Sequence, residues 1–339
     1  GKTMVRLQIG WGKAFCELNL SGNEFRRGIT EFTTPAGDGR YNLAIQVNAP
    51  EGRAEVKTIR FIPVSEEKTI LDPVKLRASR PNPEIVRGFM VAPEFSKETA
   101  RDLRSWGADV IRLQIFPLSF ARQRNQEWRE AMPAFLDDVE EKVKIARDHR
   151  LKVVIDLHHP PMPGVRADDT EMWEHPDLEK NFTAFWRAVA TRLKPYGDVI
   201  WGYDLLNEPL DRNQLPHAPR EWRPLAVKIL KAIREIDPDT PIIVACAVGG
   251  NPVGFGSLRP IDVPNTIYTV HCYLPHGYTH QGVHGAKMVG AYPGVKHDGR
   301  VWNKEMLRRS LEPVVKFQQQ YKVPIYVGEF GAARWAPGA

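Results

Sequence analysis

Polar side chains that could do chemistry follow several short apolar runs of this 339-residue sequence. The residues at these run ends are Arg112, Gln114, Asp156, His158, His159, Asn207, Glu208, His271, Tyr273 and Glu329. Two of them, Glu208 and Glu329, are carboxylic acids from distant stretches of the chain. A facing pair of carboxyl groups can cleave a glycosidic bond: one protonates the leaving oxygen, and the other meets the positive charge that develops on the sugar. We therefore treat the run ends as a candidate site.

The surrounding pattern predicts how these residues are positioned. From about residue 85, short apolar runs alternate with longer amphipathic ones, which is typical of βα units around a parallel sheet. Strands are predicted at Val86–Val91, Val110–Ile115, Lys152–Leu157, Val199–Leu205, Pro241–Cys246, Thr266–Cys272 and Pro324–Val327. Helices are predicted at about 96–106, 133–149, 178–194, 219–236 and 303–320.

This order predicts an α/β fold, a (β/α)8 or TIM barrel, whose functional side chains lie at the C-terminal ends of the strands. Glu208 and Glu329 follow the fourth and seventh predicted strands, so we expect them to face each other across the barrel mouth. Cleavage with retained configuration needs their carboxyl groups about 5 Å apart. The eighth strand is apparently missing, because the sequence stops ten residues after Glu329.

The runs around both glutamates resemble a known family. Tyr203-Asp204-Leu205-Leu206-Asn207-Glu208-Pro209 resembles its Asn-Glu-Pro motif, and Ile325-Tyr326-Val327-Gly328-Glu329-Phe330-Gly331 resembles its Gly-Glu-Phe-Gly motif. With Val153-Val154-Ile155-Asp156-Leu157-His158-His159 and Val270-His271-Cys272-Tyr273, they resemble glycoside hydrolase family 5, the cellulase family. The resemblance extends over about residues 86–331.

The resemblance implies a role for most residues of the candidate site. Glu208 would be the general acid/base, and Glu329 would be the nucleophile, kept ionised by Arg112 and oriented by Tyr273. Asn207 would bind the sugar 2-hydroxyl, His158 would contact other hydroxyls, and His271 would adjust the acid/base. His159 belongs to the same motif without a definite role. The family also places a tryptophan at the end of strand eight, and no residue of this sequence can be assigned to it.

Several of these residues have simpler alternative roles. Glu208 could be an acid at a helix N-terminus, and Arg112 could form a structural ion pair with Asp156. His158 could be a core histidine and His159 a surface one. Trp173 and Trp335, with Trp302, could stack on sugar rings or could equally anchor the core.

The stretch after the sixth strand, residues 273–302, is rich in histidine. His276, His280 and His284 have a spacing that could suit a metal, but no acidic third ligand accompanies them on a confident helix. We interpret this stretch as a solvated loop that contacts the sugar, and we predict no metal site and no cofactor.

The first part of the chain differs from the barrel. Residues 1–65 contain alternating runs, such as those at 41–47 and 56–62, and are predicted to form a partial antiparallel β-sandwich that serves as an accessory segment. The stretch 31–64 resembles the closing strands of a jelly roll. The proline-bearing stretch 66–84 is predicted as a linker, and 85–339 as the catalytic barrel, truncated at its C-terminus.

Composition narrows the class of protein. The net charge is +6, but basic residues are interleaved with acids, so we expect no nucleic-acid partner. Three cysteines lie far apart, which predicts neither a disulfide framework nor a zinc ribbon. No apolar run reaches the roughly 20 residues of a membrane span. The oligomeric state is not predicted.

The main hypothesis is a retaining endo-β-1,4-glucanase that acts on a polysaccharide or oligosaccharide. Mannan, xylan and xyloglucan are alternative substrates, since the motif residues contact the sugar at the cleaved bond, whereas the loops select the polymer. A polysaccharide-binding protein with impaired catalysis and a metal-dependent hydrolase are further alternatives. A secreted or periplasmic location is expected from the substrate alone.

Overall fold

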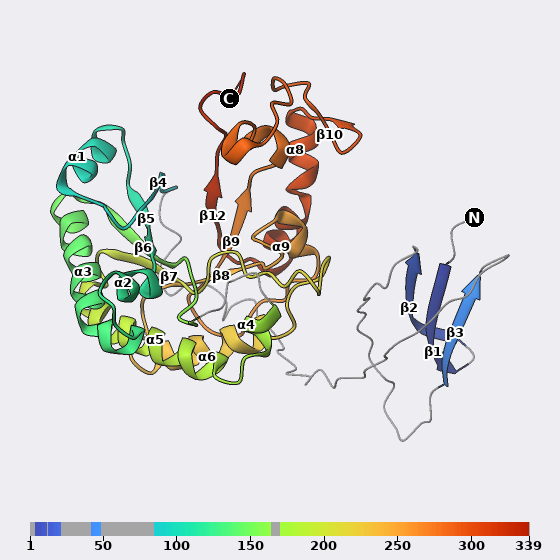
Figure 1. Cartoon of the computed structure of the whole chain (residues 1–339), viewed down its shortest axis with the longest axis horizontal. Coiled ribbons are helices and arrows are strands. Elements are labelled where there is room, and N and C mark those ends of the chain that lie inside the picture. The colour runs from blue at the N-terminus through green and yellow to red at the C-terminus, as the bar shows by residue number, and fades with distance from the viewer. Residues whose placement is uncertain (1–3, 12, 22–41, 49–84, 164–169, 339) are drawn as a thin grey trace. The chain divides into compact units, whose positions relative to one another are not determined.

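The computed structural model describes residues 4–11, 13–21, 42–48, 85–163 and 170–338. The chain divides into two compact units, Gly1–Lys68 and Thr69–Ala339. In the first unit, β1 (Met4–Trp11) pairs antiparallel with β2 (Lys13–Ser21) and with β3 (Asn42–Asn48), in the order β2-β1-β3 (Figure 1). β3 matches the alternating run at 41–47. The run at 56–62, most of the jelly-roll-like stretch and the linker 66–84 lie outside the described residues.

The second unit is built on a seven-stranded parallel sheet in the order β12-β9-β8-β7-β6-β5-β4. Its strands are β4 (Gly88–Val91), β5 (Val110–Ile115), β6 (Lys152–Leu157), β7 (Ile200–Asp204), β8 (Ile242–Ala245), β9 (Thr266–Cys272) and β12 (Ile325–Phe330). The sheet curls into a nearly closed barrel (Figure 1), which confirms the predicted TIM-barrel fold. Within the described residues β4 and β12 are edge strands, consistent with a missing eighth strand.

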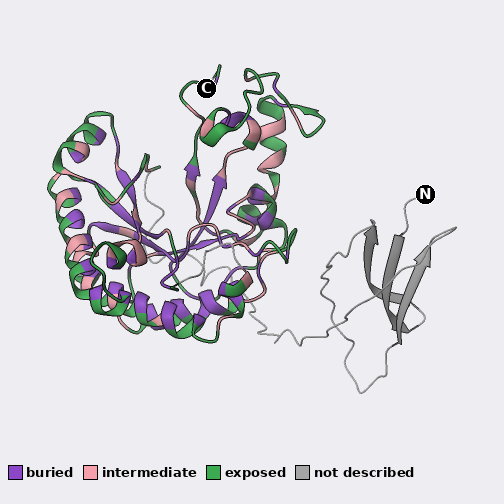
Figure 2. Cartoon of the chain, viewed as in Figure 1, coloured by how far each residue is buried: buried purple, intermediate pink, exposed green. Residues whose placement is uncertain are grey.

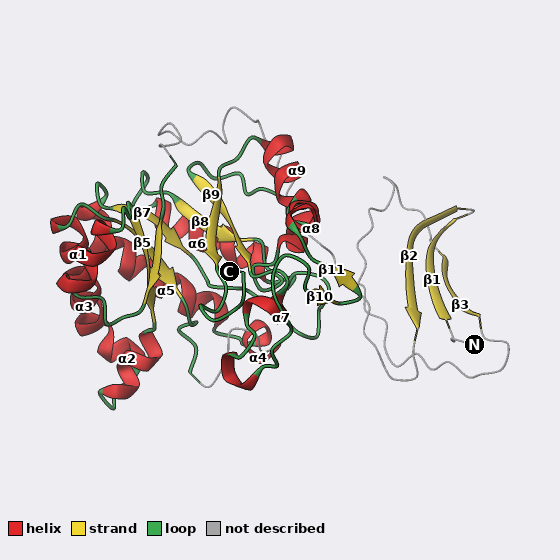
Figure 3. Ribbon diagram, turned by 90° about the horizontal axis from the view of Figure 1, so that it is seen from above, coloured by secondary structure: helices red, strands yellow, loops and turns green. Residues whose placement is uncertain are grey.

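Amphipathic helices cover the outside of the barrel (Figure 1, Figure 3). The long ones are α1 (Lys97–Ser105), α3 (Trp128–Asp148), α5 (Leu178–Leu193), α6 (Trp222–Arg234) and α9 (Glu312–Tyr321). Figure 2 shows their buried residues on the sides that face the strands, where they form one apolar core. Among the described residues, no helix is both long and apolar enough to cross a membrane.

Short elements lie in the connections. They are α2 (Pro117–Gln123), α4 (Thr170–Glu174), α7 (His276–Thr279), α8 (Lys304–Ser310), the 3₁₀ helices η1 (Lys194–Tyr196), η2 (Pro252–Gly256) and η3 (Val283–Gly285), and the hairpin β10 (Lys296–His297) with β11 (Arg300–Val301). α7, η3 and the hairpin all belong to the histidine-rich stretch after β9.

Several element boundaries differ from the sequence prediction. α3 starts at Trp128, because Trp128, Met132 and Phe135 bury one face across Pro133. The helix predicted at 303–320 is two helices that meet at Leu311, since Pro313 is favoured in a first helical turn and disfavours continuation from the preceding one. β12 continues to Phe330, with an irregular register between Val327 and Glu329, so Glu329 lies within the strand.

Candidate active site

The C-terminal ends of the barrel strands bring most of the predicted site residues together. A cavity of about 340 Å³ is lined by Glu208, Gly249, Asn251, His271, Tyr273, Leu274, His276, His280 and Glu329. Glu208 follows β7, His271 lies on β9, and Glu329 lies on β12. This is the strand end at which the sequence analysis placed the site.

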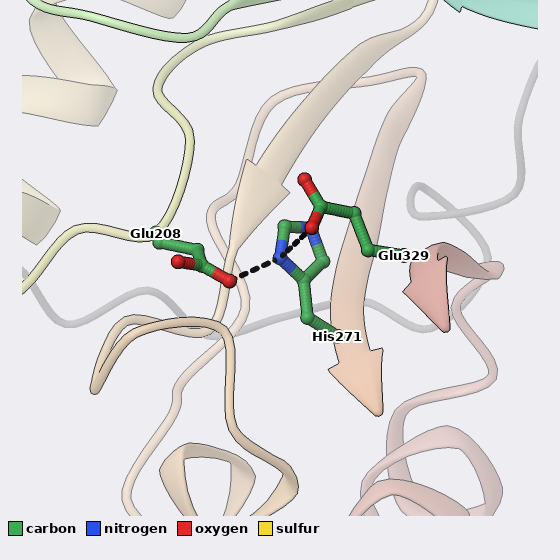
Figure 4. A group of neighbouring side chains, drawn as sticks. All are labelled: Glu208, His271 and Glu329. Carbon is green, nitrogen blue, oxygen red and sulfur yellow. Dashed lines mark hydrogen bonds and ion pairs between the residues drawn. The ribbon is translucent and has the colours of Figure 1, made fainter. Parts of the chain in front are cut away.

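His271 lies between the two glutamates (Figure 4). Its Nδ1 is 2.9 Å from Glu208 Oε1 and 3.7 Å from Glu329 Oε2. A carboxylate oxygen of each glutamate and a ring nitrogen of His271 all lie within 4.8 Å of one another. Glu208 has a positive φ of 46°, a conformation that non-glycine residues adopt at some energetic cost and that is concentrated at functional sites. The two carboxyl groups are thus close enough to act on one glycosidic bond.

Arg112, at the centre of β5, holds Glu329 in place. Its Nη1 donates to Glu329 Oε1 at 2.6 Å, its Nη2 donates to Asp156 Oδ1 at 2.9 Å, and its Nε and Nη2 both donate to Asp204 Oδ2. Burial lowers the pKa of Arg112, but the neighbouring carboxylates outweigh it and leave the pKa above its ordinary value. The predicted contact with Glu329 and the alternative ion pair with Asp156 are both present, so one buried cation serves three carboxylates.

Asp204 is the acidic member of this cluster that the sequence analysis did not single out as a candidate. It is fully buried at the end of β7, and burial raises its pKa to about 6, although the charge of Arg112 lowers it. A lone acid inside the apolar run Ile200–Asp204 was the signal that could have identified it, because unpaired acids are rarely buried.

The raised pKa of Asp204 predicts a specific pH dependence of stability. The folded protein holds a proton on Asp204 at pH 5 that the unfolded chain has released, so this contribution is full below about pH 4 and is lost as pH rises through about 6. Relative to Asp204→Asn, we expect the wild type to gain about 1 kcal/mol of unfolding free energy between pH 7 and pH 5. Urea unfolding of both proteins at the two pH values measures it, and parallel changes in both would contradict it.

The remaining predicted residues take different positions. Tyr273 donates its hydroxyl to Glu329 Oε2 at 3.0 Å, and burial, with Glu329 beside it, raises the Tyr273 pKa. Asn207 Oδ1 accepts a hydrogen bond from Arg112 Nη2 at 3.1 Å. His158 is partly exposed, with Nδ1 2.8 Å from Asp156 Oδ2, and His159 is exposed beside it. His158 is therefore not a core residue.

The tryptophans separate into two groups. Trp173 is 3% exposed and donates to the carbonyl of Leu210 at 2.8 Å, and Trp302 is 6% exposed. Neither exposes a ring face to a sugar, so stacking by these two is a wrong expectation and both anchor the core. Trp335 is 51% exposed, and its indole nitrogen donates a hydrogen bond to the carbonyl of Gln281 at 2.8 Å. Its ring is therefore exposed enough to stack on a sugar.

The histidine-rich stretch contributes two histidines to the cavity lining, His276 and His280, along with Tyr273 and Leu274. The rings of His276 and His280 stack with centroids 3.9 Å apart, while the exposed His284 is not part of the cavity lining. The sequence analysis missed Gly249 and Asn251, which follow β8 in a turn whose residues 247–250 all have positive φ. The run Gly249-Gly250-Asn251 at a strand end was the available signal.

Comparison with known proteins places this geometry in a family. The model of the family described as cellulase (glycosyl hydrolase family 5) matches residues 78–336. Endoglucanase C of Acetivibrio thermocellus is 30% identical over 274 residues, which cover 70% of this chain and 77% of the relative. Cellodextrinase A of Ruminococcus flavefaciens is 22% identical over 257 residues, covering 72% and 73%.

Solved structures agree with this. An endoglucanase from the hyperthermophilic Thermotoga maritima is 27% identical and superposes with a TM-score of 0.58, covering 73% of this chain and 80% of that one. A hyperthermophilic endo-β-1,4-glucanase solved with substrate is 26% identical, with a TM-score of 0.56 over 71% and 72%. The chain therefore belongs to glycoside hydrolase family 5, the cellulase family, and is a glycoside hydrolase.

Proposed function

We propose that this protein is a retaining endo-β-1,4-glucanase in which Glu208 is the general acid/base and Glu329 the nucleophile. The observation that carries the proposal is the approach of their carboxylate oxygens to within 4.8 Å. Retaining enzymes keep the two groups about 5 to 5.5 Å apart, whereas inverting enzymes need about 6.5 to 9.5 Å to admit a water molecule.

The contacts of each glutamate suit a different half of the reaction. Glu329 has one oxygen bound by Arg112 and the other by Tyr273, which fixes its orientation for attack on the anomeric carbon. Glu208 contacts His271 with one oxygen, and 38% of its side chain is exposed, which leaves it room to protonate the leaving oxygen. Attack by Glu329 forms a glycosyl-enzyme ester, and Glu208 then removes a proton from the water that hydrolyses it.

The proposed substrate rests on the relatives. Two of them are named as endoglucanases, and a structure of the Thermotoga maritima enzyme that is 25% identical to this chain was solved with cellobiose. His276 and His280 line the cleft and offer polar groups for sugar hydroxyls, while Asn207 and His158 offer further polar groups beside the Arg112 cluster. These features support a β-1,4-linked glucan as the substrate.

A panel of soluble polysaccharides tests the proposal. Reducing sugar should be released from carboxymethylcellulose and mixed-linkage β-glucan, with a rapid fall in viscosity that indicates cleavage within the chain. Faster release from mannan, xylan or xyloglucan would assign that polymer as the substrate and leave the proposed reaction unchanged. An equal residual signal from the wild type and from Glu329→Gln would reject catalysis and favour a polysaccharide-binding protein.

Metal ions separate this reaction from a metal-dependent hydrolase. A carboxylate-pair enzyme should keep its full activity after treatment with a chelator. Added Cu²⁺ should inhibit it, because Glu208, His271 and Glu329 offer two oxygens and one nitrogen within 4.8 Å, close enough for one cation with bonds of about 2.0–2.2 Å. Inhibition should weaken as cellobiose concentration rises. Loss of activity on chelation, restored by metal, would instead support metal-dependent hydrolysis.

The proposal extends to the compartment. Polymeric glucans do not enter cells, so we expect the enzyme to act in a secreted or periplasmic location. Fractionation of the source cells with an antibody to this chain would check this, and a purely cytoplasmic signal would contradict it.

A further inference from the structure

The side of His271 that faces away from the glutamates is a polar feature that the proposed mechanism leaves unexplained. His271 is 3% exposed, and its Nε2 is buried without a hydrogen-bond partner among the described residues. Thr269 lies two residues earlier on β9, on the same face of the strand, and is fully buried. Within the same described set its hydroxyl Oγ1 is also without a partner.

Gly328 brings these two atoms to one place. A Cβ atom at residue 328 would lie 2.6 Å from Thr269 Oγ1 and 2.8 Å from His271 Nε2. On another side of the ring, a Cβ at Gly250 would lie 2.8 Å from His271 Cγ. The imidazole is thus packed against two glycines from neighbouring strand ends, and its Nε2 and the Thr269 hydroxyl both border Gly328.

We propose that Thr269 is a positioning residue whose hydroxyl donates a hydrogen bond to His271 Nε2, directly or through one water, and so holds the imidazole proton on Nδ1. A buried polar atom left unpaired is destabilising, which favours this pairing over two unsatisfied atoms. Nδ1 faces two carboxylates, Glu208 at 2.9 Å and Glu329 at 3.7 Å, so it is the nitrogen that needs the proton. In a neutral imidazole, Nε2 is then an acceptor.

The tautomer of His271 decides whether the acid proton of Glu208 can reach the substrate. This step rests on the proposed function. With a proton on Nδ1, His271 donates to Oε1 of Glu208, so the acid proton sits on Oε2 and is free for the glycosidic oxygen. With the proton on Nε2 instead, Nδ1 would accept a hydrogen bond from the carboxylic acid of Glu208 and hold the acid proton away from the substrate. Thr269 therefore affects acid catalysis without touching the sugar.

Asp204 is the competing partner for Nε2. Its Oδ1 is also buried without a partner in the described part of the chain, and it lies close enough to His271 for their charges to interact. As a carboxylate it would accept a hydrogen bond from a protonated Nε2, so His271 would be an imidazolium or the other neutral tautomer. The groups that act on His271 are thus Glu208, Glu329 and Asp204, and a direct measurement of the protonated nitrogens separates the two arrangements.

Nitrogen-15 NMR of the histidine-labelled full chain is the test, since it reports each ring nitrogen independently of activity. We expect His271, assigned by comparison with His271→Gln, to be protonated only at Nδ1 in the wild type and to shift toward the Nε2-protonated form in Thr269→Val. Thr269→Ser should restore the wild-type spectrum. Thr183→Val is the matched control, because Thr183 Oγ1 is likewise buried without a partner in the described structure but lies on α5.

Kinetics supply the second readout. Thr269→Val should lower kcat on β-glucan about tenfold and displace the alkaline limb of the kcat/KM profile, while Thr269→Ser and Thr183→Val stay within about twofold of the wild type. A His271 protonated at Nε2 in the wild type, or a spectrum unchanged in Thr269→Val, overturns the proposal. A spectrum moved by Asp204→Asn but not by Thr269→Val also overturns it and identifies Asp204. If no glycan is cleaved but the spectra behave as expected, the proposed function fails and the tautomer assignment stands.

Discussion

Glu329→Gln is expected to lower kcat on soluble β-glucan by at least about 10⁴-fold, the largest effect of any single substitution in this protein. The amide is nearly isosteric with the carboxylate, but it cannot form the glycosyl ester. One of its two former acceptor positions also becomes a donor, so it cannot accept from both Arg112 and Tyr273. Initial rates of reducing-sugar release measure the loss, and circular dichroism checks that the fold is retained.

A matched surface substitution gives the baseline. Glu312 on α9 is exposed and paired with Lys316, so Glu312→Gln should leave kcat within about twofold and the stability almost unchanged. A Glu329→Gln protein that retains more than about a hundredth of the wild-type rate would contradict a nucleophilic role. Such a result would move the nucleophile to water and require an inverting mechanism, which the short separation of Glu208 and Glu329 disfavours.

The barrel and its two glutamates could be predicted because each rests on a local pattern. β5, β6 and β9 have the predicted limits, since each is rich in β-branched and other apolar residues and is almost wholly buried. The parallel order then places the carboxyl ends of β7 and β12 at one mouth, which brings Glu208 and Glu329 together without further information.

The rest of the site depends on contacts that no local pattern contains. Trp173 has a side chain that could stack on a sugar ring, but the packing of α4 and α6 buries it against Trp222. In the sequence Asp204 is only a member of a motif. Its contact with Arg112, 92 residues earlier, is visible only in the structure. Gly328 is a motif glycine in the sequence, whereas the structure shows it making room for Thr269 and His271.

Glu208→Ala is expected to have the second largest effect, and the effect should depend on the leaving group. On β-glucan, whose sugar leaving group needs a proton, kcat should fall about 10²- to 10⁴-fold. On an aryl β-cellobioside with an acidic phenol, the first step needs no proton, so the glycosyl ester should form rapidly and appear as a burst of phenol before slow turnover. Stopped-flow absorbance measures the burst and its amplitude.

Azide then tests the geometry as well as the role. A small anion that enters the space left by the Glu208 side chain does not need a general base, so azide should speed turnover of the aryl substrate and give a β-glycosyl azide. Its β configuration requires attack on the face of the sugar opposite Glu329, from the part of the cavity that the Glu208 side chain has vacated. An α-azide, or rescue of Glu329→Ala instead of Glu208→Ala, would exchange the two assigned roles. Equal losses on glucan and on the aryl substrate, with no azide rescue, would show that Glu208 shapes the site without transferring a proton.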